Sequence, residues 1–287
     1  MLIGCGQITW RGMPEIQALE DIAHAGYAGS PPRLGIDRTA RETLELYHRY
    51  GLEPAPCYFS APFWREDVRK RIVDDACKAA AFVRELGCTE LYVAAGGDYT
   101  ARSGRTRREV AAHVGADDGL TDAEFRVFVE TLDAVGEAAL KEGVRTCFHS
   151  HVGTVIETAA EVQRLLDETD PELVFLGPDT GHLAWAGIDV VAFFHRHLDR
   201  IKTMHLKDID AAVRARGSES GWDYDRFAQN GVFIELGEGC VDLPGLIQLL
   251  RGRDFRGWLI VETDVTRKPS ALASATVSRQ YLRRLGL

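Results

Sequence analysis

Short apolar runs rich in β-branched residues alternate along the chain with longer stretches of helical periodicity. This alternation predicts strands that are each followed by a helix. The predicted strands are Leu2–Gly6, Gly26–Gly29, Glu53–Phe59, Glu90–Ala94, Val144–His149, Leu173–Leu176, Ile201–Leu206 and Gly257–Glu262. The predicted helices cover residues 14–25, 38–50, 66–86, 121–142, 157–168, 188–198, 242–252 and 268–284.

Residues at the ends of these segments agree with the pattern. Thr121 and Glu124 form a capping-box signature, and Gly51, Gly87 and Gly143 each stand between a predicted helix and the next strand. Eight strand–helix units imply parallel strands joined by right-handed crossovers.

A closed (β/α)8 barrel takes about 250 residues, and the chain has 287. We therefore expect an α/β fold, one TIM barrel that uses residues 1–287 as a single domain. The competing doubly wound sheet usually carries a GxGxxG turn after its first strand. The segment Gly4-Cys5-Gly6-Gln7-Ile8-Thr9 lacks the third glycine, so no dinucleotide site is expected.

Composition narrows the classes of function. The formal net charge of −9 argues against a nucleic-acid partner and against an anionic membrane surface. The chain contains no apolar run near the ~18 residues that cross a bilayer, and residues 1–10 lack the basic start of a secretory signal. The six cysteines are scattered and include no CxxC pair, so we expect them to be free thiols in a reducing compartment. We expect a cytoplasmic protein.

The candidate chemistry lies where the active sites of such barrels lie, at the carboxyl ends of the strands. Alternate residues of a strand share a face, so His149 can point the same way as His151, and His205 the same way as Lys207. The four successive ends from the fifth to the eighth strand carry His149, Asp179, His205 and Glu262. Imidazole and carboxylate suit Mn²⁺, Co²⁺, Fe²⁺ or Zn²⁺.

Each of these residues also has a structural explanation when it is taken alone. A single histidine can be a hydrogen-bonded structural residue, Asp179 before Thr180-Gly181 can cap a helix, and Glu262 can form an ion pair. Four titratable groups at one barrel mouth would all need partners when buried, and a metal ion supplies one partner for all of them.

Two further features are open to two interpretations each. Trp10 and Trp185 follow predicted strands, where an aromatic side chain either walls a pocket or closes the top of the barrel. The arginine-rich stretch 102–108 follows the fourth strand. It is expected to be a solvated surface, and a lid that attracts an anionic substrate is the alternative.

The sequence resembles the sugar phosphate isomerase/epimerase superfamily of xylose-isomerase-like TIM barrels and, within it, the myo-inosose-2 dehydratases. The resemblance is most specific between about Val144 and Glu262. It is carried by Gly6-Gln7-Ile8-Thr9-Trp10, His149-Ser150-His151-Val152-Gly153-Thr154, Asp179-Thr180-Gly181-His182, His205-Leu206-Lys207-Asp208, Gly237-Glu238-Gly239-Cys240-Val241-Asp242, Gly257-Trp258 and Val261-Glu262.

The resemblance implies a divalent metal held by Glu, Asp, His and Glu. Asp179, His205 and Glu262 match the last three places, and His149 stands in the first. That departure favours the dehydratase branch over the isomerases. Mn²⁺ or Co²⁺ is the expected ion, with Zn²⁺, Fe²⁺ or Mg²⁺ as alternatives. A second departure is Ser30-Pro31, which stands where the superfamily usually has a glutamate, so the substrate can differ from the usual one.

The implied reaction is the loss of water from a cyclic polyol ketone such as 2-keto-myo-inositol (scyllo-inosose). His151 and His182 would form the acid–base pair, and Lys207 would orient the substrate or stabilise negative charge. The remaining candidates for substrate binding are Gln7, Trp10, Trp185 and Asp208, of which Asp208 would also hold Lys207.

Three alternatives remain open at this point. A sugar isomerase or epimerase can use the same metal site, and a barrel can bind a sugar without catalysis. An abasic-site nuclease shares the fold, but the net charge of −9 opposes DNA binding. Barrels of this kind often form dimers or tetramers, so we expect a homo-oligomer.

Overall fold

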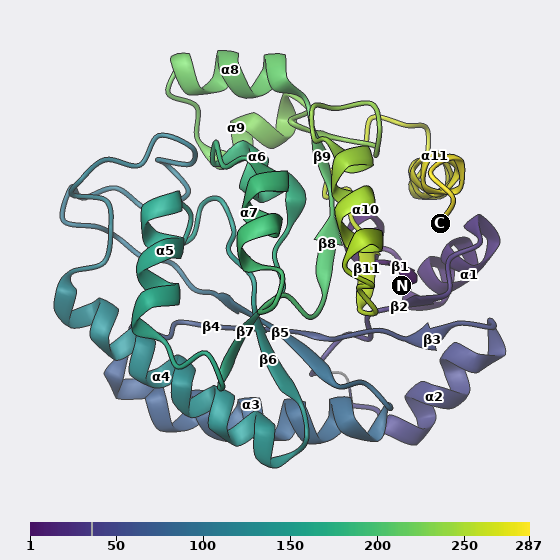
Figure 1. Ribbon diagram of the computed structural model, residues 1–287, viewed down its shortest axis with the longest axis horizontal. Coiled ribbons are helices and arrows are strands. Elements are labelled where there is room, and N and C mark those ends of the chain that lie inside the picture. Colours follow the sequence, from purple (N-terminus) through teal and green to yellow (C-terminus); the bar gives the residue numbers. More distant parts are fainter. Residues whose placement is uncertain (36) are drawn as a thin grey trace.

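The computed structural model describes residues 1–35 and 37–287. Strands and helices alternate along most of the chain (Figure 1). The strands are β1 (Leu2–Cys5), β2 (Gly29–Ser30), β3 (Glu53–Pro54), β4 (Tyr58–Ala61), β5 (Glu90–Ala95), β6 (Arg145–Phe148), β7 (Val174–Leu176), β8 (Met204–Leu206), β9 (Asp208–Ile209), β10 (Phe233–Ile234) and β11 (Trp258–Val261). The helices are α1 (Glu15–Ala25), α2 (Ala40–Arg49), α3 (Arg69–Glu85), α4 (Asp122–Lys141), α5 (Ala159–Glu168), α6 (Thr180–Trp185), α7 (Val190–His197), α8 (Ala211–Glu219), α9 (Tyr224–Gln229), α10 (Leu243–Gly252) and α11 (Ala271–Arg284), with short 3-10 turns at Gln7–Trp10 and Glu66–Val68.

The parallel strands form two hydrogen-bonded sheets in the orders β3-β2-β1-β11-β8 and β4-β5-β6-β7. Two parallel bridges, Leu176 with Ile201 and Asp179 with His205, join β7 to β8. At the other seam, β3 and β4 are two halves of one predicted strand, separated at residues 55–57. Pro54 and Pro56 lack the N–H that a continuous ladder needs there. The expected TIM barrel is confirmed.

The barrel interior is filled beneath the functional strand ends. Tyr92 on β5 is fully buried, and its hydroxyl lies 2.7 Å from Oγ1 of Thr203, which directly precedes β8. Because β5 and β8 are not neighbours, this contact crosses the barrel. A Cβ atom at Gly177 would lie 2.7 Å from the Tyr92 ring, so the glycine is required for the ring to fit. Tyr92 therefore forms the floor of the space above it.

In the described residues 1–35 and 37–287, all eight predicted helices are present, and three further helices were not predicted: α6, α8 and α9. Figure 1 shows α8 and α9 above α6 and α7, at one end of the molecule. Their apolar side chains, Trp222, Tyr224 and Phe227 among them, join Trp185 and Phe233 in a second buried cluster. This insertion covers one side of the barrel mouth. Among the described helices, none is long and apolar enough to span a bilayer.

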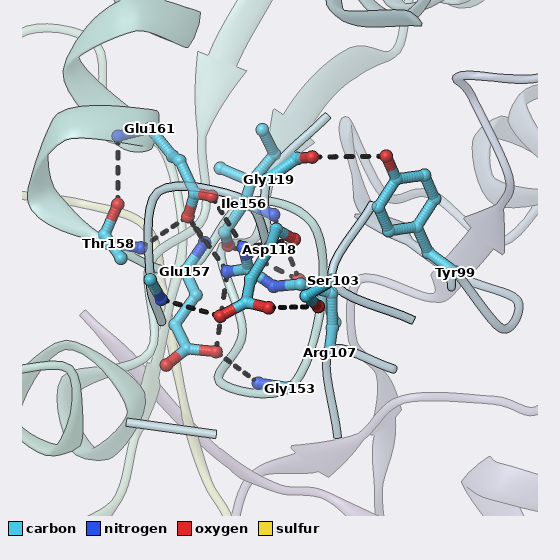
Figure 2. Close-up of polar contacts among 12 residues, drawn as sticks. Tyr99, Ser103, Arg107, Asp118, Gly119, Gly153, Ile156, Glu157, Thr158 and Glu161 are labelled. Atoms are coloured by element: carbon cyan, nitrogen blue, oxygen red, sulfur yellow. Dashed lines mark hydrogen bonds and ion pairs between the residues drawn. The ribbon is translucent and has the colours of Figure 1, made fainter. Parts of the chain in front are cut away.

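The long connection between β5 and α4 is anchored by a buried arginine (Figure 2). Arg107, expected on a solvated surface, is only 2% exposed, and its two terminal nitrogens donate to the two carboxylate oxygens of Glu161 at 2.8 and 3.0 Å. Its guanidinium also lies 3.7 Å from Glu157, and burial raises the pKa of that carboxyl group to about 7 although Arg107 lowers it. Arg102 is exposed as expected. The connection is thereby fixed to the segment that follows β6.

Replacing Arg107 with methionine should destabilise the protein, because the substitution leaves Glu157 and Glu161 without their cation. We expect the free energy of unfolding to fall by about 3 kcal/mol, as when one partner of a buried ion pair is removed. Urea unfolding followed by circular dichroism measures it. The matched control is Arg102→Met, whose exposed pair with Asp117 should contribute less than about 1 kcal/mol. Equal losses in the two variants would contradict the anchoring role.

Candidate active site

Four strand ends bring the predicted ligands to the same place. His149 follows β6, Asp179 follows β7, His205 lies in β8 and Glu262 follows β11. Backbone hydrogen bonds continue the strand ladders through these positions, from the N–H of His149 to the carbonyl of Val93 and from the N–H of Glu262 to the carbonyl of Leu206. The pleat therefore decides that these side chains face the barrel axis.

The ligand atoms of these residues converge. One ligand atom each from His149, Asp179 and His205 lies within 4.8 Å of the others, and all three side chains are buried. Nδ1 of His205 is 3.2 Å from Oε2 of Glu262 and 3.8 Å from Oδ2 of Asp179. Burial raises the pKa of Glu262, but the nearby His205, Lys207 and His149 lower it by more than burial raises it. The pKa of Glu262 therefore lies well below its ordinary value.

Asp179 uses its two oxygens for different purposes. Oδ1 accepts a hydrogen bond of 2.9 Å from the N–H of His182 and caps α6. Oδ2 faces the cluster. The helix-capping explanation and the ligand explanation are therefore both correct, each for one oxygen.

The cluster fits a divalent cation. Within residues 1–35 and 37–287, Oδ2 of Asp179 and Nδ1 of His205 are buried without a well-aligned hydrogen bond, and their near neighbours are the charged groups of Lys207 and Glu262. Such buried polar atoms are costly unless a partner is bound. His149 donates from Nδ1 to the carbonyl of Gly177 at 3.1 Å, which leaves its Nε2 lone pair free for a metal. Burial lowers the pKa of His149 well below its ordinary value, so the ring is neutral as a ligand must be.

Lys207 forms the second part of the site. Its ammonium group lies 3.0 Å from Asp179, 3.4 Å from Glu262 and 2.6 Å from Asp264. Burial lowers the pKa of Lys207, but the three carboxylates raise it more, so the group is held protonated. A Cβ atom at Gly181 would lie 2.6 Å from Cγ of Lys207, so only glycine lets the lysine pass α6. Three carboxylates and one ammonium leave a formal charge of −2, which a divalent cation neutralises.

The two histidines of the predicted acid–base pair differ in their surroundings. Nδ1 of His151 donates to the carbonyl of Val152 at 2.6 Å, so we assign a bare Nε2, and the ring lines the cavity. Burial and then Lys207 lower the pKa of His151 to about 4. His182 is buried and packs against His151, with ring centroids 3.5 Å apart. Nε2 of His182 lies 3.3 Å from the ammonium nitrogen of Lys207, within hydrogen-bond distance. His182 therefore positions Lys207 and does not line the cavity.

A cavity of about 680 Å³ opens above the cluster, within the roughly 300–1,000 Å³ usual for small-molecule sites. His149, His151, His205, Lys207 and Glu262 line it. Its aromatic walls come from Tyr58, Tyr224 and Phe233. Three of the four predicted ligands and two of the three predicted catalytic residues thus line one cavity, while Asp179 is buried beneath it.

The structure corrects three other assignments, those of Trp10, Trp185 and Asp208 to substrate binding. Trp10 is fully buried and donates its indole N–H to Asp21 at 2.7 Å. Trp185 is fully buried behind His182, with the rings stacked at 6.0 Å. Neither tryptophan lines the cavity, so both close the top of the barrel.

Asp208 is also structural and does not hold Lys207. Its two oxygens accept hydrogen bonds of 2.9–3.1 Å from four backbone N–H groups, of residues 209, 237, 239 and 241. This ties the turn around Gly237-Glu238-Gly239 to the end of β8. Gln7 does line the cavity, but its amide is engaged by Arg33, Pro31 and Tyr47.

Sequence reasoning missed two residues of the site. Asp264 makes the shortest contact to Lys207, and Tyr58 faces the histidines, with its ring centroid 5.4 Å from that of His149. The signal for Asp264 was present, because it stands two residues after Glu262, the same alternation that pairs His149 with His151. Tyr58 had no such signal, since it lies beyond the break in the third predicted strand.

Comparison with known proteins agrees with this architecture. The family model described as "Xylose isomerase-like TIM barrel" matches residues 19–285. The chain belongs to this family.

Similar curated proteins of this family are named inosose dehydratases. One from Halalkalibacterium halodurans is 31% identical, covering 98% of this chain and 94% of that protein. Another from Mesomycoplasma hyopneumoniae is 30% identical, covering 99% and 95%. These relatives confirm the prediction of a hydro-lyase.

Similar solved structures support the fold. The probable 3-DHS dehydratase of Bacillus anthracis superposes with a TM-score of 0.74 at 17% identity, covering 99% of both chains. The 3-keto-D-glucoside 4-epimerase of E. coli does so with a TM-score of 0.70 at 18% identity, covering 100% of this chain and 99% of that one. This barrel therefore carries enzymes named for elimination and for epimerisation.

His205→Ala should weaken binding of a divalent cation, because it removes the ligand that faces both Asp179 and Glu262. We expect the affinity for Mn²⁺, measured by calorimetry on chelator-treated protein, to fall at least tenfold. His24→Ala is the control, since His24 is exposed on α1 and should leave the affinity unchanged. Unaltered Mn²⁺ binding by His205→Ala would rule out the proposed ligand set.

Proposed function

We propose that this protein is a metal-dependent hydro-lyase that removes water from a cyclic polyol ketone of the inosose type. One observation carries the proposal: a neutral histidine, a fixed ammonium group and three of the four candidate metal ligands line the same cavity. The names of the curated relatives support the substrate class. Mn²⁺ or Co²⁺ is the proposed ion.

The ligands would be His149, Asp179, His205 and Glu262. A divalent cation held there would supply Lewis acidity, which would make the C–H bond next to the ketone more acidic. The other steps belong to side chains of this chain.

His151 is the proposed base. Its Nε2 carries no proton and can therefore accept the α-proton of the substrate. Its low pKa keeps the ring neutral at neutral pH, which is the form that a base needs. The same low pKa makes the protonated ring a strong acid. His151 can therefore return the proton to the departing β-hydroxyl, which leaves as water while the new carbon–carbon double bond forms.

Lys207 is the proposed electrostatic group. Its raised pKa makes it a poor proton donor, so we assign it to stabilising the negative charge that develops on oxygen. His182 positions it from behind, through the 3.3 Å contact with Nε2. The predicted acid–base pair is thus revised to one proton-transferring residue and one positioning residue.

The test is a metal-supplemented assay with scyllo-inosose, read by the ultraviolet absorbance of the enolic dione product. His151→Ala should lower kcat by about 10²–10⁴-fold, the usual contribution of a general acid–base residue. His24→Ala should match the wild type. Proton NMR in D2O distinguishes the alternatives, because an isomerase or epimerase would exchange the α-proton and interconvert ketones without forming the chromophore. Protein that binds the ketone but neither exchanges its proton nor eliminates water would contradict the proposal.

A further inference from the structure

The cavity rim carries positive charge that the catalytic cluster does not use. Its lining includes Arg11, Arg33 and Arg108 in addition to Lys207. Arg108 is neutralised by an ion pair with Asp225 and packs over Tyr224, 4.1 Å from the ring centroid. Across residues 1–35 and 37–287, neither Arg11 nor Arg33 is ion-paired. In a chain with a net charge of −9, two free cations at the mouth of the active cavity need an explanation.

Arg33 is held in place by a buried residue. Its Nε donates to Oε1 of Gln7 at 3.0 Å. Gln7 is 8% exposed, and its amide nitrogen donates to the carbonyl of Pro31 at 3.1 Å and to the hydroxyl of Tyr47 at 2.8 Å. Tyr47 is fully buried. The exposed arginine is therefore oriented from its Nε side by a fixed chain of hydrogen bonds.

This arrangement leaves the binding edge of Arg33 available. In the part of the chain that the structure describes, its two terminal nitrogens make no hydrogen bond. A free surface arginine loses rotamer freedom when it binds a ligand, and orientation by Gln7 reduces that loss. Two parallel N–H groups of a guanidinium match the two oxygens of a carboxylate or a phosphate.

The arginine shares a wall with the catalytic cluster. Gly6 precedes Gln7, and a Cβ atom at Gly6 would lie 2.5 Å from Oε1 of Glu262. The segment that holds Arg33 therefore packs directly against a proposed metal ligand. Residues 29–35 (Gly-Ser-Pro-Pro-Arg-Leu-Gly) contain no acidic side chain, so nothing in this segment repels an anion, and Pro31 and Pro32 restrict its backbone.

We propose that Arg33 binds an anionic group of the substrate, so that the enzyme prefers a polyol ketone bearing a carboxylate or a phosphate over a neutral one. Gln7 is the positioning residue for Arg33, and Arg11 adds positive potential at the same rim. This inference rests on the proposed function for the reaction, but it concerns recognition alone and can be tested by binding.

The experiment compares three probes by calorimetry on Mn²⁺-loaded protein at constant low ionic strength. They are neutral scyllo-inosose, the carboxylated ketone 3-dehydroquinate and the phosphorylated ketone fructose 6-phosphate. The wild type should bind one of the anionic probes more tightly than scyllo-inosose, and the tighter one identifies the anionic group. Arg33→Gln should reduce that preference, measured as the ratio of Kd values, by about tenfold or more, the usual effect of losing a charge-assisted hydrogen bond.

Two further variants separate orientation from charge. Gln7→Met keeps the arginine but removes its acceptor, so the preference should fall by less than in Arg33→Gln. Arg41→Gln is the matched control, because Arg41 is 85% exposed on α2 outside the cavity and should leave the ratio unchanged.

The outcomes distinguish the two proposals. No preference for either anionic probe in the wild type, or the same preference in Arg33→Gln and wild type, would overturn the recognition proposal even if scyllo-inosose is dehydrated. If the protein binds an anionic probe more tightly through Arg33 but eliminates water from none of the probes, the recognition proposal is supported and the hydro-lyase assignment is contradicted.

Discussion

The top of this barrel depends on one buried charge, the ammonium group of Lys207. It contacts carboxylates that follow β7 and β11 and a histidine on α6, so it links the side chains of three elements. Burying an isolated ion costs on the order of several kcal/mol. With Lys207 in place, three carboxylates can stand close together without a bound metal. Their excess over the ammonium is two charges, which matches the charge of the divalent ion proposed to bind there.

Much of this architecture could be predicted from the sequence, because the strands and helices of the barrel follow from the local spacing of apolar residues. The eight strand–helix units follow from periodicity, and the strand-end rule then selects the ligands. The exceptions have physical causes. The third strand is broken by Pro54 and Pro56, and α8 and α9 pack on Trp185 and Phe233, outside the barrel repeat. Their apolar residues serve a local cluster, so they carry no signal of the repeat.

The roles inside the site were harder to predict than its location. His151 and His182 look equivalent in the sequence, each at a strand end with a free ring. They differ because Asp179 caps the short helix α6 through Oδ1, and this helix places His182 behind Lys207. Similarly, Asp208 resembles a site residue, but four backbone N–H groups occupy its oxygens. Tertiary hydrogen bonds decide such cases, and local sequence does not contain them.

The site divides into two halves with different physical requirements. The half built from β6, β7, β8 and β11 is buried, and its groups are held by mutual charge and by strand ladders, so any one change disturbs the others. The half built around Gln7 and Arg33 comes from the 3-10 turn after β1 and the loop after β2, where Arg33 is exposed. It contacts the first half where Gly6 packs against Glu262 and where Thr9 donates to the carbonyl of Thr263. A substitution at position 33 can alter what the cavity admits with little effect on the buried charges. If Arg33 binds an anionic group as proposed, the same proposed proton-transfer residues would serve substrates of different charge, and residues at the cavity rim would select among them.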